Sequence, residues 1–319
     1  MNNISVVTEF YFLDFPGPWD LKLLQVSFVI LIYLSALMGN GLIITITSLD
    51  PSLHTPMYFF LKNLSLFDLF LISAVVPKTI VNFLTHCNSI SFLGCSAQVF
   101  LVLFSGAAEL FLLTAMSFDR YAAICHPLHY DVIMNRGMCV QMVVVSWFCG
   151  GFMSLIHTVN TFSLSYCRLN EIQQFFCDIP RLLAISCSEH VSAVIVPILI
   201  NAVLDFCCFV CIITSYSYIF STIRKIPSTQ GQSKAYSTCL PHLTVVVLFV
   251  STAFIAYIKP IFGSTSFIDL ILSAFYILLP PSLNPIIYSL KNKAMKTGLE
   301  KWIVRKLWKK ENILIVLKE

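Results

Sequence analysis

The chain has 319 residues, of which 57% are hydrophobic and only 11% are charged, and its formal net charge at pH 7 is +4. A soluble protein of this length needs more charged surface to cover its core, so the composition indicates a membrane protein. The sequence contains no phosphate-binding glycine loop, zinc-ligand spacing or nucleophile elbow, which argues against the enzyme and nucleic-acid-binding classes that these motifs mark.

Mostly apolar runs follow one another along the chain, and each is long enough to cross a bilayer as a helix, which takes roughly 20 residues. In chain order we place seven of them, at 23–49, 57–84, 94–125, 138–160, 191–221, 237–259 and 267–290. The alternating strands of a transmembrane barrel do not occur. The sequence therefore predicts an all-α, seven-transmembrane helix bundle over 23–290, with an outer segment 1–22 before it and a tail 291–319 after it.

The basic residues give the orientation of the bundle. They concentrate near the ends of the third and fifth spans on one side, and above all in the tail 291–319. Because lysine and arginine mark the cytoplasmic side, we expect the tail inside the cell and the N-terminus outside. The net charge is therefore a topology signal rather than a nucleic-acid footprint. Asn3 begins the sequon Asn3-Ile4-Ser5 in the outer segment and is the expected glycosylation site.

Cysteines support the same orientation. Four of the twelve fall on the predicted outer side of the membrane, where disulfides persist, namely Cys95, Cys167, Cys177 and Cys187. Four cysteines allow three pairings, and their spacing does not choose among them. Cys87 also lies on the outer side, with no assigned partner.

The third span ends on a charge pair, Asp119 and Arg120, at its cytoplasmic end. One interpretation is that Arg120 merely extends to the lipid headgroups. The other is a switch, in which Asp119 holds Arg120 in one state and releases it in another to meet a cytoplasmic partner.

Several motifs then follow in a fixed order along almost the whole chain. They are Gly39-Asn40, "LHTPMYFFLKNLSLFDL" at 53–69, "MSFDRYAAICHPLHY" at 116–130, Ser215-Tyr216, "KAYSTCLPHL" at 234–243 and "PPSLNPIIYSLKN" at 280–292. In content and spacing the series resembles the olfactory (odorant) receptors, a branch of the rhodopsin-like G-protein-coupled receptors. The resemblance implies a plasma-membrane receptor that binds a small volatile odorant and activates a stimulatory, olfactory-type heterotrimeric G protein. It implies no enzyme activity.

Other classes fit less well. A receptor for a non-odorant small molecule is the nearest alternative, although we expect such a receptor to differ at 53–69 and 234–243. A transporter would show repeats related by symmetry, and the spans show no internal similarity.

The resemblance assigns roles to individual residues. The switch residues that it implies are Asp119, Arg120, Tyr121, Tyr216, Lys234, Asn284, Pro285 and Tyr288. Asn284 and Pro285 match a kink in the seventh span, where the missing proline amide weakens the helix. The resemblance also implies two disulfides, Cys95 with Cys177 and Cys167 with Cys187.

Two acidic residues, Asp68 and Glu109, fall inside predicted spans at similar depth, where a charge is costly and usually marks function. With Asn284 they match a sodium-binding cluster of related receptors, and oxygen ligands suit such a hard cation. A protonated, hydrogen-bonded acid pair without an ion is the equal alternative, so sodium is a possible cofactor only.

Helical spacing names a face for the ligand in the outer half of the bundle. The candidates are Val102, Leu103, Gly106, Ala107 and Leu110 in the third span, His157 in the fourth, Asn201, Leu204 and Asp205 in the fifth, and Val250, Phe254 and Tyr257 in the sixth. In the family this region holds the odorant, which implies a mostly apolar pocket. Helix packing is the alternative role for each aliphatic residue, and Asp205 either anchors the ligand or pairs with Asn201 one turn away.

One motif departs from the family. Olfactory receptors commonly carry Phe-Tyr-Gly-Thr in the sixth span, whereas this chain reads "FVST" at 249–252. Val250 replaces the tyrosine that links pocket to switch, and Tyr257 is the nearest aromatic hydroxyl on that face. Beyond the last span, tryptophans among lysines and arginines in 301–319 predict an amphipathic helix on the inner leaflet, with an unstructured basic tail as the alternative.

Overall fold

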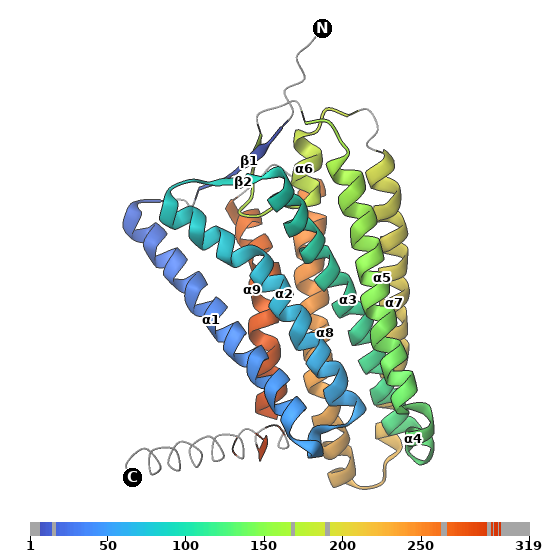
Figure 1. Ribbon diagram of the computed structural model, residues 1–319. Coiled ribbons are helices and arrows are strands. Elements are labelled where there is room, and N and C mark those ends of the chain that lie inside the picture. The colour runs from blue at the N-terminus through green and yellow to red at the C-terminus, as the bar shows by residue number, and fades with distance from the viewer. Residues whose placement is uncertain are drawn as a thin grey trace, which may run out of the picture.

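The computed structural model describes residues 7–14, 17–166, 170–188, 192–262 and 267–291, together with residues 295, 297, 298 and 300. Within 255–273 and 289–291 it describes the backbone alone. Long helices run side by side as one bundle (Figure 1). They are α1 Trp19–Leu49, α2 Pro56–Thr85, α3 Phe92–Cys125, α5 Arg136–Phe162, α7 Ser192–Lys225, α8 Thr229–Phe262 and α9 Phe267–Lys291.

These long helices match the seven predicted spans one for one. Among the described residues, α1, α2, α3, α5, α7 and the part of α8 up to Phe254 are long and apolar enough to cross a membrane. The largest difference is at the start of α8, which begins at Thr229 rather than near residue 237. Hydropathy marks where a helix enters hydrocarbon, whereas the polar residues 229–236 continue the helix beyond it.

Short elements connect the long helices. On the side where α1 ends and α8 begins they are η1 Pro51–Leu53, η2 Pro127–His129 and α4 Tyr130–Ile133. On the opposite side they are α6 Ile179–Ile185 and the strands β1 Glu9–Phe12, β2 Ser89–Ser91 and β3 Glu171–Ile172. Polar side chains cap two of the long helices. Ser91 Oγ accepts from the Gly94 amide at 3.1 Å to begin α3, and Asn135 Oδ1 accepts from the Met138 amide at 3.0 Å to begin α5.

α3 packs closely on its neighbours because small residues line the contacts. A Cβ added to Gly150 of α5 would lie 3.1 Å from the backbone nitrogen and the Cβ of Ala108, so the two backbones can approach only because this position is glycine.

α1 likewise lies close to α9. A Cβ on Gly39 of α1 would lie 2.8 Å from Pro285 in α9. α1 is further fastened to α9 by Asn40, whose amide donates to the Pro281 carbonyl at 2.8 Å.

The N-terminal segment forms the middle strand of a three-stranded sheet over the end of the bundle opposite η1, η2 and α4 (Figure 1). β1 pairs antiparallel with β2 and parallel with β3. Its side chains alternate, so that Phe10 and Phe12 are buried while Glu9 and Tyr11 are exposed. Phe10 is fully buried and packs on Phe92 and Tyr166. This sheet was not predicted, because four alternating residues are too short a signal.

One disulfide joins Cys95 in α3 to Cys177 in the loop between β3 and α6, with the two Cα atoms 5.6 Å apart. This pairing confirms the one implied by the family resemblance. Cys187 is also disulfide-bonded, and Cys167 lies outside the described residues. Cys87 is exposed and free.

Candidate switch and ligand site

The predicted switch pair is closed. Arg120 forms an ion pair with Asp119, and Arg120 Nε donates to Asp119 Oδ2 at 2.9 Å. The other carboxylate oxygen of Asp119 accepts from the Tyr130 hydroxyl of α4 at 2.7 Å. The Arg120 side chain is 12% exposed, whereas an arginine extended to lipid headgroups would be largely exposed. The geometry is therefore the held arrangement that the switch interpretation requires.

A second polar link lies in the same layer, between α7 and α8. A hydrogen bond of 2.6 Å joins the Tyr216 hydroxyl to His242 Nδ1, and the two rings stack. Both side chains are buried. Tyr288 of α9 is buried as well, and it lies within electrostatic range of Tyr216 and Arg120. Helices α3, α7, α8 and α9 thus each contribute a polar side chain to one buried layer, which we call the switch layer: Arg120, Tyr216, His242 and Tyr288.

Sequence reasoning missed two members of this arrangement. His242 stood inside the quoted motif 234–243 and Tyr130 inside 116–130, but neither had a role. A histidine within an apolar span is itself a usable signal, because a polar group there needs a partner. For Tyr130 the sequence offers no comparable signal, since its contact with Asp119 depends on how α4 folds back.

The remaining predicted switch residues lie around this layer. The Tyr121 hydroxyl is 3.0 Å from His126 Nε2, and its ring packs edge-on against Tyr218 of α7. Lys234 is exposed near the start of α8. Pro285 lies within α9, next to Asn284.

The acidic pair lies in the middle of the bundle. Asp68 of α2 is fully buried and accepts two hydrogen bonds of 3.1 Å from the Asn284 amide of α9. Glu109 of α3 is also fully buried and is close enough to interact electrostatically with Asp68. Within the described residues, both Glu109 oxygens, Ser105 Oγ and Asn284 Oδ1 have no hydrogen-bond partner. A buried carboxyl group in this condition needs either a proton or a cation.

Among the described side chains, the predicted ligand residues lie in several different surroundings. Val102 packs in a cluster with Leu71 and Tyr276, and a Cβ on Gly106 would lie 2.9 Å from the Tyr276 hydroxyl. Tyr276 of α9 therefore occupies the space that was assigned to ligand on this face of α3. Leu103 and Ala107 of α3 are half-buried, as is Leu110 below them.

The other candidates are divided between buried and exposed positions. His157 is buried in α5, and its Nδ1 has no hydrogen-bond partner among the described residues. The Asn201 amide donates to Asp205 at 2.9 Å, which is the pairing alternative. Leu204 is exposed on α7, and the Tyr257 side chain lies outside the described part of the chain.

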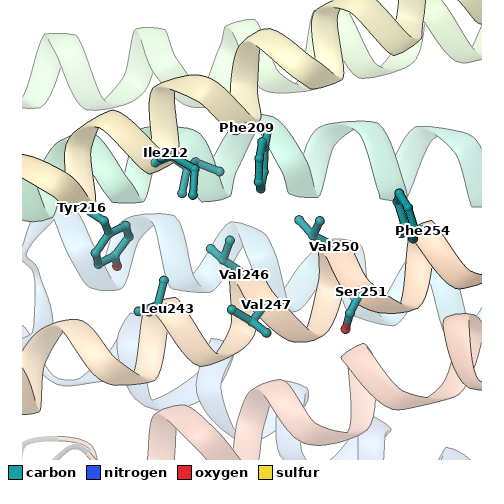
Figure 2. A pocket seen from close by; sticks show the side chains of 10 residues that line it. Phe209, Ile212, Tyr216, Leu243, Val246, Val247, Val250, Ser251 and Phe254 are labelled. Atoms are coloured by element: carbon teal, nitrogen blue, oxygen red, sulfur yellow. The ribbon is translucent and has the colours of Figure 1, made fainter.

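Val250 and Phe254 do come together, in a cavity of about 400 Å³ between α7 and α8 (Figure 2). Tyr216 of the switch layer forms one end of this cavity. Its lining comes from α7 and α8 alone.

Comparison with known proteins decides the family. The family model described as olfactory receptor matches residues 29–306. The chain belongs to the olfactory receptor family. It is 62% identical to human olfactory receptor 14A16 over 97% of its own length and all of that relative. It is 53% identical to human olfactory receptor 14A2, covering 94% of the chain and 95% of the relative, and 42% identical to gorilla olfactory receptor 1G1, covering 94% and 96%.

Membership settles the broad function. The receptor is a multi-pass membrane protein of the G-protein-coupled signalling type, and it is an odorant receptor rather than an enzyme.

Proposed function

We propose that this receptor lies in the plasma membrane with its N-terminus outside, binds a small, mostly apolar odorant in the outer half of the bundle, and couples to a stimulatory, olfactory-type G protein. The observation that carries the proposal is the closed switch layer, in which Asp119 holds Arg120 beside the Tyr216–His242 link. Both contacts must open before Arg120 can reach a cytoplasmic partner.

The chemistry of the outer half supports an odorant-sized ligand. Apolar side chains dominate among the predicted ligand residues, and those with a described polar side chain are His157 and the Asn201–Asp205 pair. Each buried CH₂ contributes about 0.8 kcal/mol, so a small volatile molecule gains its affinity by burial and its selectivity from one or two hydrogen bonds.

The mechanism is a shift between two arrangements. In the described arrangement the Tyr216–His242 bond ties α7 to α8, and Tyr130 steadies Asp119. An odorant activates if it binds better to an arrangement in which the inner end of α8 has moved outward, which breaks that tie and frees Arg120. Moving a two-state population from 1:99 to 99:1 requires about a 10⁴-fold difference in affinity.

The acidic pair is proposed as the receptor's ion or proton site. Asp68, Glu109, Ser105 and Asn284 offer the oxygen ligands that suit sodium, and the unpartnered Glu109 oxygens favour an occupant. If bound, sodium would offset one of the two buried negative charges. The alternative is protonation of the carboxyl groups, which removes the charge without an ion.

Three further parts of the proposal lie wholly or partly outside the described residues. Asn3 is the proposed glycosylation site of the outer segment, and residues 301–319 are proposed to lie on the inner leaflet as a basic amphipathic helix. The Cys167–Cys187 disulfide is proposed for the outer loop.

A cyclic AMP reporter tests the proposal. Cells expressing the receptor are screened with a broad panel of volatiles, beside Arg120→Ala and the control Arg136→Ala, an exposed arginine at the start of α5. We expect a dose-dependent response that Arg120→Ala abolishes and Arg136→Ala keeps, at matched surface levels. A response that survives Arg120→Ala would refute the switch. Silence of a well-displayed receptor would lead to Val250→Tyr, which restores the family's usual tyrosine.

A further inference from the structure

The cavity between α7 and α8 is an apolar groove that opens toward the outside of the bundle. On its open side Val247 is 59% exposed and Phe254 is 61% exposed. Its back is closed by buried side chains, Ile212 at 1%, Val246 at 4% and Tyr216 at 3% exposure. Figure 2 shows side chains from the two helices pointing toward one another across the gap.

The residues around the groove indicate which kind of molecule has access to its open side. Exposed apolar residues of α7 lie beside it, including Phe206 and Val210, and the exposed Ile213 is part of its lining. On a membrane-spanning helix such a surface faces lipid hydrocarbon, where no water is present. The groove is a continuation of this lipid-facing surface into the gap between two helices. Lipid hydrocarbon therefore has access to the open side of the groove.

The dimensions of the groove fit one hydrocarbon chain. The lining on α8 extends from Leu243 to Phe254, about 16 Å at 1.5 Å per residue. The volume of about 400 Å³ lies within the range of small-molecule sites. An empty space of this size would deprive the lining side chains of dispersion contacts.

We propose that this groove is a seat for one acyl chain of a membrane phospholipid, and that the seated chain favours the described arrangement of α7 and α8. Tyr216 connects the two effects. Its ring forms the inner end of the groove, and its hydroxyl bonds to His242. An outward movement of the inner end of α8 would break that bond and reshape the seat, so the chain binds the two arrangements with different affinity. This second statement rests on the proposed switch, whereas the seat itself rests only on membrane embedding.

Photolabelling tests the seat. The full receptor is placed in nanodiscs of phosphatidylcholine with a diazirine in the middle of an acyl chain, irradiated, and analysed by peptide mass spectrometry. Val144 of α5 is 58% exposed and serves as the reference for ordinary lipid-facing surface. We expect labelling at Phe209, Val247 and Phe254 to exceed labelling at Val144. Equal labelling would overturn the proposal.

Two matched variants sharpen the result. Val247→Trp fills the groove, and Val144→Trp makes the same change at an equally exposed position away from it. The excess labelling of Phe209 and Phe254 should be lost in Val247→Trp and kept in Val144→Trp. Excess labelling that persists in a folded Val247→Trp receptor would overturn the seat. A second probe, a free diazirine alkane of odorant size, tests the other occupant. Strong labelling of the groove by this alkane, with no labelling by the lipid probe, would also overturn the proposal.

The coupling is tested with the same probe after a stimulatory G protein is bound without nucleotide. The excess labelling should fall while Val144 labelling stays constant. An unchanged excess in a stable complex would overturn the coupling and leave the seat, whereas failure to form any complex would count against the proposed G-protein partner.

Discussion

Tyr130→Phe should raise the ligand-independent activity of the receptor. The substitution removes a single oxygen atom, that of the hydroxyl that donates to Asp119 Oδ1 at 2.7 Å, and leaves the ring in place. Burial and the neighbouring Asp119 carboxylate raise the pKa of Tyr130 above its usual value, so the hydroxyl keeps its proton and remains a donor at physiological pH. The loss therefore acts on the held arrangement at any pH used in cells.

The magnitude follows from the type of bond. A hydrogen bond to a charged group contributes about 1.5–3 kcal/mol, and each 1.4 kcal/mol is a factor of ten in an equilibrium constant. If this hydrogen bond forms only in the held arrangement, its removal destabilises that arrangement alone. The ratio of released to held receptor then rises about 10- to 100-fold. Arg120 then has a single partner that is itself less firmly placed.

The assay is basal cyclic AMP at matched surface expression. Tyr218→Phe is the control, because it removes the hydroxyl of an exposed tyrosine on α7. Tyr130→Phe should increase the basal signal while Tyr218→Phe leaves it unchanged. Asp119→Asn should also increase it, and combining Asp119→Asn with Tyr130→Phe should add little, since both act on one contact. Basal activity at the wild-type level in Tyr130→Phe, with Asp119→Asn active, would refute a holding role for Tyr130.

Three further predictions concern the end of the receptor that carries the β-sheet. Phe10→Ala should cost about 3–5 kcal/mol of stability, as for other buried phenylalanines, and lower the thermal midpoint in detergent. Tyr11→Ala, on the exposed face of β1, should leave the midpoint unchanged. Equal effects of the two substitutions would mean that β1 does not pack as described. Gln98→Ala should lower the midpoint too, by about 1–3 kcal/mol for each group left unpaired, because Gln98 accepts from the Cys177 amide at 2.7 Å and donates to the Ala74 carbonyl at 2.9 Å. Burial raises the pKa of Asp178 to about 6, against a weaker opposing effect of Arg181, so the protonated form is favoured in the folded receptor. Its contribution is fully present below about pH 4 and is lost as pH rises through about 6. Thermal stability should therefore fall between about pH 4 and 6 in wild type and less so in Asp178→Asn; identical profiles would contradict this.

The bundle was predictable because a membrane span leaves a strong and local signal. Runs of about 20 apolar residues located all seven long helices. The polar ends of helices, such as residues 229–236 of α8, were not predicted because they lie outside the apolar runs. The switch pair was predictable for a similar reason, since a charge at the end of an apolar span stands out. Its closed geometry was not, because both the ion pair and the Tyr130 bond depend on side-chain positions.

The ligand site was less predictable, and the reason is visible at Gly106. Helical spacing correctly placed Gly106 on the inner face of α3, but it could not reveal which neighbour fills the space in front of a glycine. In the structure the neighbour is the Tyr276 hydroxyl of α9. On α7 and α8, spacing could not separate residues that face inward from residues that face lipid, since both kinds are aliphatic or aromatic. Phe254, 61% exposed, is the clearest example.

The same limit explains why the groove could not be found from the sequence. Its lining residues are ordinary apolar residues, and only the spacing between α7 and α8 turns them into a concave surface. Tyr216 is the exception, because the family resemblance marked it as a switch residue. Its position is therefore informative. The Tyr216 ring closes one end of the groove, and its hydroxyl bonds to His242. A movement of this side chain therefore changes both contacts. An acyl chain in the groove, as proposed, would therefore act on the switch layer through Tyr216.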